Sequence, residues 1–85
     1  MIGVIRVANS RILIVDDEEL IRDLIKEYIS LENFVADEAV DGIQALQLFK
    51  QFNYDLIILD VMMPGMDGWS LCREIRKTSQ VPVIM

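Results

Sequence analysis

The chain has 85 residues, of which 53% are hydrophobic, so it has room for a single small domain with a limited core. Its formal charge of −6 and its lack of a Lys/Arg cluster argue against direct nucleic-acid contact by this segment, and with one cysteine, Cys72, and no histidine a zinc site or an internal disulfide is not expected. No apolar run approaches the roughly 18–20 residues of a membrane span, and residues 1–10 lack a secretory cleavage site, so we expect a cytoplasmic protein with no membrane contact.

The first half of the chain alternates between strand and helix patterns. The aliphatic run from Arg11 to Val15 predicts a strand covered on both faces. Acidic residues then start a helix, whose apolar positions recur at helical spacing: Leu20, Ile21, Leu24, Ile25, Tyr28 and Ile29. Phe34 to Ala39 predicts a weaker strand. After a turn at residues 40–42, a second helix has these apolar positions: Ile43, Leu46, Phe49 and, at its end, Phe52.

The second half continues the alternation. The segment DLIILD, residues 55–60, predicts a third strand, and Trp69, Cys72 and Ile75 mark a third helix that ends in the basic segment 76–79. VPVIM, residues 81–85, begins a fourth strand. Regular alternation of strands and helices predicts an α/β fold, a doubly wound parallel sheet with right-handed crossovers.

Carboxylates follow two of these strands. Asp16 and Asp17 come after the first strand, and Asp60 ends the third. Open parallel sheets bind ligands at the carboxyl ends of strands where the winding reverses, so we expect the three side chains to converge there if strands two and three flank strand one. Like charges repel unless a cation offsets them, and Mg²⁺ prefers such oxygen ligands. A helix cap or turn is the alternative for any one of them, but three together favour a metal site.

The chain resembles the receiver domain of two-component response regulators. ILIVDDEE (12–19) matches the family's first strand and acidic pair, DLIILDVMMPGMDG (55–68) its phosphoacceptor strand and following loop, and DGIQAL (41–46) the start of its second helix. The match runs from Arg11 to Met85 without a gap. It implies a flavodoxin-like sheet of order 2-1-3-4 and a partial receiver domain over residues 11–85, which lacks helix 4, strand 5 and helix 5.

The resemblance also implies a function. Asp60 would be the phosphoacceptor, with Asp16 and Asp17 holding Mg²⁺ directly or through water and the main-chain carbonyl of Met62 as a further ligand. The donor would be a sensor histidine kinase, a phosphotransfer protein or a small phosphodonor. Such a domain takes part in its own phosphoryl transfer and is not an enzyme. The family's Ser or Thr after strand four and its Lys after strand five have no counterpart in these 85 residues.

Other functions fit the residues less well. A haloacid-dehalogenase-like phosphohydrolase needs a second acid two residues after its nucleophile, where this chain has Met62. A flavodoxin-like flavin carrier needs a loop after strand one that binds a phosphate, and the acidic segment DDEE, residues 16–19, would repel that phosphate. The remaining alternative is a non-catalytic interaction or oligomerising fragment of a receiver domain that no longer switches. In either case, transcription regulation through DNA contact would need another domain.

Residues 1–10 and the last strand bear on assembly. Residues 1–10 contain the strand formers Ile2, Val4 and Ile5, so we expect either an unstructured leader or an extra edge strand. VPVIM would be an apolar edge on which only Pro82 hinders pairing. We therefore expect a homo-oligomer.

Overall fold

The structure is a computed structural model that describes residues 10–63 and 65–85, so the expectations for residues 1–9 and for Pro64 lie outside the described residues. The strands are β1 (Arg11–Val15), β2 (Val35–Ala39), β3 (Leu56–Leu59) and β4 (Val83–Ile84). The helices are α1 (Glu19–Ser30), α2 (Gly42–Gln51) and α3 (Gly68–Arg76). Each lies within a few residues of its predicted position. None of the described helices is long and apolar enough to cross a membrane.

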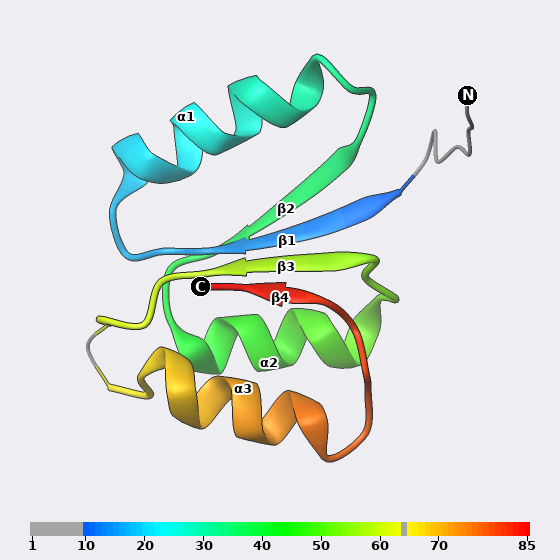
Figure 1. The fold of residues 1–85 in the computed structure, drawn as a ribbon. Helices are drawn as coiled ribbons and strands as arrows, with labels where there is room; N and C mark the ends of the chain where they lie inside the picture. Colours follow the sequence, from blue (N-terminus) through cyan, green and yellow to red (C-terminus); the bar gives the residue numbers. More distant parts are fainter. Residues whose placement is uncertain (1–9, 64) are drawn as a thin grey trace.

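All strand pairs are parallel, and the sheet has the order β2-β1-β3-β4, which confirms the predicted flavodoxin-like arrangement. The helix α1 covers one face of the sheet, while α2 and α3 cover the other (Figure 1). β1 lies between β2 and β3, so that Leu13 is in register with Asp37 on one side and with Ile57 on the other. The direction of winding therefore reverses between β1 and β3, at the carboxyl ends of these strands.

The two faces of β1 enter two separate cores. Ile12 and Ile14 pack on the α1 side, and Leu13 and Val15 pack on the side of α2 and α3. All four are at most 2% exposed, which explains why the strand reads as a continuous apolar run. The larger core also includes buried side chains from α2, β3 and α3: Ala45, Ile57, Leu59, Leu71 and Ile75.

The α1 face of the sheet is covered less completely than the helical pattern predicts. Leu24 and Tyr28 belong to the predicted apolar positions of this helix, yet they are 56% and 76% exposed. The reason is that α1 packs on β1 and β2, which leaves an apolar groove of about 640 Å³ between the helix and Ile58 of β3. On this face Ile29 is the buried residue of α1.

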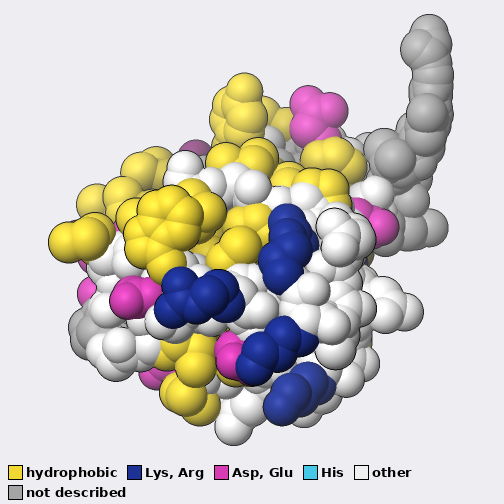
Figure 2. All heavy atoms as spheres, turned by 60° about the horizontal axis from the view of Figure 1, so that its bottom comes forward, with side chains coloured by type: hydrophobic (Ala, Val, Ile, Leu, Met, Phe, Trp, Pro, Cys, Tyr) yellow, Lys and Arg dark blue, Asp and Glu magenta, His cyan; other side chains and the backbone are white. Residues whose placement is uncertain are grey.

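The opposite side of the molecule carries a cluster of basic side chains. Figure 2 shows Lys and Arg side chains beside exposed hydrophobic ones on the side of α2 and α3. A shallow hollow of about 450 Å³ there is lined by Trp69 and Cys72 of α3 and by three cations at the end of this helix: Arg73, Arg76 and the C-cap residue Lys77. Cys72 is half-buried and packs against the larger core. Arg73 and Arg76 lie in the last turn, where the helix dipole favours positive charge.

A polar cluster ties the amino-terminal ends of the strands together. The Arg11 Nε donates to Asp37 Oδ2 at 2.6 Å, the Tyr54 hydroxyl donates to the same oxygen at 2.7 Å, and the Arg11 guanidinium lies 3.8 Å from the centre of the Phe52 ring. The Arg11 hydrogen bond holds the pKa of the Asp37 carboxyl below its usual range, while burial and the bond to Asp37 raise the pKa of Tyr54. Asp37 thus links β2 to β1 and to the segment before β3.

The lowered pKa of Asp37 predicts a pH-dependent contribution to stability. Because the folded pKa lies below the unfolded value of about 3.9, the contribution is present above that pH and is lost as the pH falls through the folded pKa. We expect Asp37→Asn to lower the thermal midpoint by several degrees at pH 7, with a difference from wild type that closes below about pH 3.9. Glu32→Gln, at an exposed carboxylate after α1, is the control. A pH-independent difference would contradict the role assigned to the Asp37 charge.

Candidate functional site

Three carboxylates meet at the carboxyl ends of β1 and β3. Asp16, Asp17 and Asp60 each offer an oxygen, and these oxygens lie within 4.8 Å of one another. We call these residues the acidic cluster. The sheet ladder positions two of them directly, since the Asp60 amide donates to the Val15 carbonyl at 2.9 Å and the Asp16 amide donates to the Ala39 carbonyl at 3.1 Å. The convergence expected from the sequence therefore follows from parallel pairing on both sides of β1.

Local hydrogen bonds orient two of these side chains. The Asp16 carboxylate is 9% exposed, and its Oδ1 accepts the Glu18 amide at 2.9 Å. Asp60 is half-buried, and its Oδ1 accepts the Met62 amide at 3.1 Å. Each bond uses one oxygen and leaves the second carboxylate oxygen for another ligand. Asp17 is exposed, and its carboxylate lies on the solvent side of the acidic cluster.

The charge of the acidic cluster suits a hard divalent cation. The ion pairs among the described residues do not include any of its three side chains. Within residues 10–63 and 65–85, no cation forms an ion pair with these carboxylates, and carboxylate oxygens are the ligands that Mg²⁺ prefers. The donor set fits a magnesium ion that keeps water or phosphate oxygens as its other ligands.

Met62 follows Asp60 in the loop between β3 and α3. Its side chain is 81% exposed, and its amide is used by Asp60. The acidic cluster consists of carboxylates, and ligation by the main-chain carbonyl of Met62 stays a prediction.

Two glycines shape this loop for different reasons. Gly65 has a φ of 75°, in the left-handed region that other residues rarely adopt. Gly68 starts α3 where the chain passes close to the end of β3, and a Cβ atom there would lie 2.6 Å from the Val61 Cα and 2.8 Å from the Asp60 carbonyl oxygen. Asp67 caps α3 by accepting the Ser70 amide at 2.7 Å. Gly68 thus allows α3 to begin directly against the backbone of Asp60.

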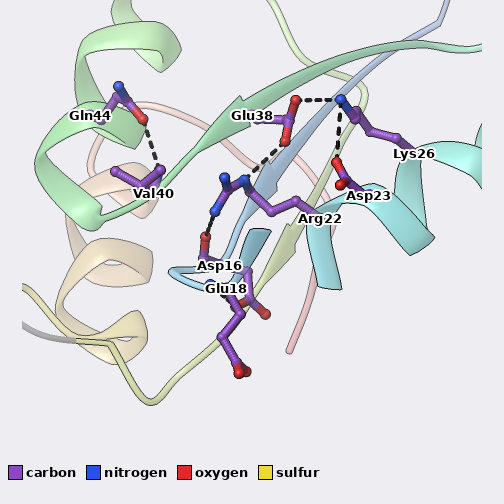
Figure 3. Close-up of polar contacts among 8 residues, drawn as sticks. All are labelled: Asp16, Glu18, Arg22, Asp23, Lys26, Glu38, Val40 and Gln44. Carbon is purple, nitrogen blue, oxygen red and sulfur yellow. Dashed lines mark hydrogen bonds and ion pairs between the residues drawn. The ribbon is translucent and has the colours of Figure 1, made fainter. Parts of the chain in front are cut away.

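Two charged residues near the acidic cluster, Arg22 and Glu38, were not predicted from the sequence to belong to the site. The Arg22 Nη1 of α1 donates to the Asp16 carbonyl at 2.8 Å, and its Nε donates to Glu38 of β2 at 2.9 Å (Figure 3). The sequence pattern that could have indicated this role is the position of Arg22, a cation six residues after Asp16 in an otherwise acidic helix start. Its partner lies 16 residues further along the chain, on a strand whose neighbours only the fold defines.

The fold and the strand-end carboxylates define a class of signalling domain. Residues 12–85 match the family described as "Response regulator receiver domain". The chain belongs to this family.

Similar proteins of known name include the transcriptional regulatory protein ResD of Bacillus subtilis, 49% identical over 91% of this chain and 32% of ResD. The probable transcriptional regulator ycf27 of Guillardia theta is 48% identical over 91% of this chain and 30% of that protein. The chain therefore spans about a third of the length of these curated relatives.

Solved structures show the same fold. The response regulator TrrA of Thermotoga maritima in complex with Mg²⁺-BeF superimposes with a TM-score of 0.84 at 45% identity, over 89% of this chain and 67% of that one. TrrA in complex with the histidine kinase ThkA gives a TM-score of 0.82 at 45% identity, over 87% of this chain and 65% of that one.

The close approach of Gly68 to the backbone of Asp60 and Val61 predicts that an added methyl group destabilises the fold. Because a Cβ atom would meet backbone atoms, Gly68→Ala should destabilise the fold by about 1–3 kcal/mol and move the loop after Asp60. Gly65→Asn is the matched control, since no atom lies within 4 Å of its added Cβ and Asn tolerates a positive φ. Urea unfolding and the amide spectrum of the loop check both effects. Equal stability of Gly68→Ala and wild type would contradict this packing.

Proposed function

We propose that this chain accepts a phosphoryl group on Asp60, with Mg²⁺ held by Asp16 and Asp17. The observation that carries the proposal is the convergence of these carboxylate oxygens within 4.8 Å at the end of the strand pair β1 and β3. We include the Met62 carbonyl as a further metal ligand, because Met62 lies two residues after Asp60 and its amide already contacts that side chain. The phosphodonor is a sensor histidine kinase or a phosphotransfer protein.

The reaction is a displacement at phosphorus. A carboxylate oxygen of Asp60 forms a bond to phosphorus, the bond from phosphorus to the donor's imidazole nitrogen breaks, and the electron pair stays on that nitrogen. The product is an acyl phosphate. When bound, Mg²⁺ neutralises charge on the transferring oxygens. The chain contributes position, since the ladder bond to Val15 and the Met62 amide fix the backbone and one oxygen of Asp60.

Two solved structures of one relative, TrrA, support the metal and the donor. TrrA, 45% identical to this chain, has been crystallised with Mg²⁺-BeF and with the histidine kinase ThkA. The superposition with TrrA covers 89% of this chain. In this proposal the domain is a substrate of the transfer and not an enzyme.

The names of the relatives support the wider setting. ResD and ycf27 are both named as transcriptional regulators, so we place this domain in transcription regulation. The cytoplasmic location expected from the sequence is part of the same proposal. Since the chain spans about a third of these proteins, contact with DNA belongs in this proposal to a further domain. The segment itself has a formal charge of −6, which disfavours contact with phosphates.

A second candidate function is that of an interaction fragment that assembles without switching. The observation that favours it is the outer edge of β4, which pairs with β3 alone among the described strands, with Ile84 56% exposed. Such an edge invites another strand, and we propose a homo-oligomer on this basis.

Assembly through β4 can be tested with a single surface change. Light scattering coupled to gel filtration should show a dimer or larger species, and Ile84→Lys should shift the mass towards the monomer, because a charge on an edge strand opposes pairing. Val83 packs against the core and is the wrong position for this change. A wild-type monomer at micromolar concentration would contradict the assembly proposal.

The proposed metal site predicts saturable Mg²⁺ binding that depends on the cluster. Titration with Mg²⁺, followed by Trp69 fluorescence or by amide shifts, should give affinity that Asp17→Asn weakens by about tenfold, since the metal loses a charged ligand. Asp23→Asn, at an exposed carboxylate of α1 outside the acidic cluster, should leave the affinity unchanged. If both variants weakened Mg²⁺ binding equally, the ion would be attracted by the overall negative charge of the chain and not held at a specific site.

The proposed phosphoacceptor predicts a single labelled residue. Incubation with acetyl phosphate and Mg²⁺, followed by borohydride trapping and mass spectrometry, should place the modification on Asp60. Asp60→Asn should abolish it, and Asp55→Asn, at the opposite end of β3, should not. A label on Asp16 or Asp17 would contradict the assignment, and no label on any residue would favour the interaction fragment.

A further inference from the structure

Glu38 of β2 binds two cations from α1. Its Oε2 accepts the Lys26 Nζ at 2.6 Å, and its Oε1 accepts the Arg22 Nε at 2.9 Å (Figure 3). The hydrogen bond from Lys26 and then that from Arg22 lower the pKa of Glu38. The carboxylate is therefore charged at neutral pH and ties the helix to the edge strand of the sheet.

Arg22 extends from this ion pair to the acidic cluster. Its Nη1 donates to the main-chain carbonyl of Asp16 at 2.8 Å, and its side chain is 11% exposed. Figure 3 shows the guanidinium between Glu38 and the Asp16 backbone. The cation thus lies beside the acidic cluster, yet its described contacts are to a carbonyl and to Glu38 and not to the three carboxylates.

This arrangement avoids a competing ion pair. A guanidinium presents five donors and pairs readily with carboxylates, often through two bonds at once. If Arg22 turned from Glu38 towards the acidic cluster, it would occupy oxygens that a divalent cation needs. Glu38 supplies an alternative carboxylate on the other side of the guanidinium and offsets its charge.

We propose that Glu38 is a positioning residue for the acidic cluster: it holds the Arg22 guanidinium on the carbonyl of Asp16 and away from the cluster carboxylates, which stay open to a divalent cation. This inference rests on the proposed function, because the cation in question is the Mg²⁺ of the phosphoryl transfer. It assigns a role in metal binding to a residue of β2 that touches neither the metal ligands nor Asp60.

The test is a rescue by a second change. Glu38→Gln should raise the dissociation constant for Mg²⁺ about tenfold, the lower end of the effect of residues that support metal ligands. Adding Arg22→Met to Glu38→Gln should restore most of the affinity, because the competing cation is gone. A purely structural role of the ion pair predicts the opposite, namely that the double variant binds Mg²⁺ at least as weakly as Glu38→Gln.

Lys26→Gln is the matched control. It removes the shorter of the two ion pairs of Glu38 but leaves Arg22 in place, so the affinity for Mg²⁺ should stay within about twofold of wild type. Thermal unfolding without Mg²⁺ establishes that each variant is folded. If Glu38→Gln does not fold, Glu38→Asp shortens the side chain while it keeps the charge, and should weaken Mg²⁺ binding in the same rescuable way.

A metal-free readout separates this inference from the proposed function. A crystal structure of Glu38→Gln without Mg²⁺ should show the Arg22 guanidinium bound to a carboxylate of the acidic cluster. A guanidinium that stays on the Asp16 carbonyl, or an unrescued double variant, would overturn the inference while leaving the proposed function intact. If the wild type binds no Mg²⁺, the proposed function fails, and the position of Arg22 in the variant still decides whether Glu38 restrains it.

Discussion

The structure depends on the parallel pairing of β1 with strands on both of its sides. β1 is in register with β2 and β3, so the residues that follow it and β3 reach the same edge of the sheet. Ladder bonds continue to the first residues beyond the strands, with the Asp16 amide on Ala39 and the Asp60 amide on Val15. These bonds bring three negative charges together, a placement that costs free energy unless a cation or water offsets them.

The buried strand makes this placement possible. Ile12, Leu13, Ile14 and Val15 are nearly fully buried, and they anchor β1 in one core on each face of the sheet. A carboxylate at the end of such a strand has little freedom of position, because the backbone that carries it cannot shift without disturbing both cores. The same rigidity would favour Asp60 in its proposed role as nucleophile, because the contribution of a nucleophile to a displacement is largely its position.

The two faces of the sheet differ in what surrounds the acidic cluster. On the side of α2 and α3, Gly68 lets the loop after Asp60 lie directly against its own strand. On the α1 side, Arg22 and Glu38 place a neutralised cation beside the Asp16 backbone. The loop lies on one side of the acidic cluster and donates the Met62 amide to Asp60, while the restrained cation Arg22 lies on the other side and bonds to the Asp16 main-chain carbonyl and to Glu38. The α1 side also retains an apolar groove beside Ile58, so packing there is less complete than around the larger core.

The sequence by itself determined the alternation of strands and helices, the parallel sheet and the candidate residues Asp16, Asp17 and Asp60, because burial on both faces and a charge at the end of an apolar run leave local patterns. The family resemblance supplied the strand order and the hypothesis that Asp60 is the phosphoacceptor. Only the tertiary structure decided which apolar positions are covered: Leu24 and Tyr28 fit the helical pattern but stay exposed, since periodicity does not show how far a helix covers a sheet. It also decided the partners of Arg22, because an ion pair between a helix and an edge strand depends on how β2 lies beside β1, and neither local segment contains that information.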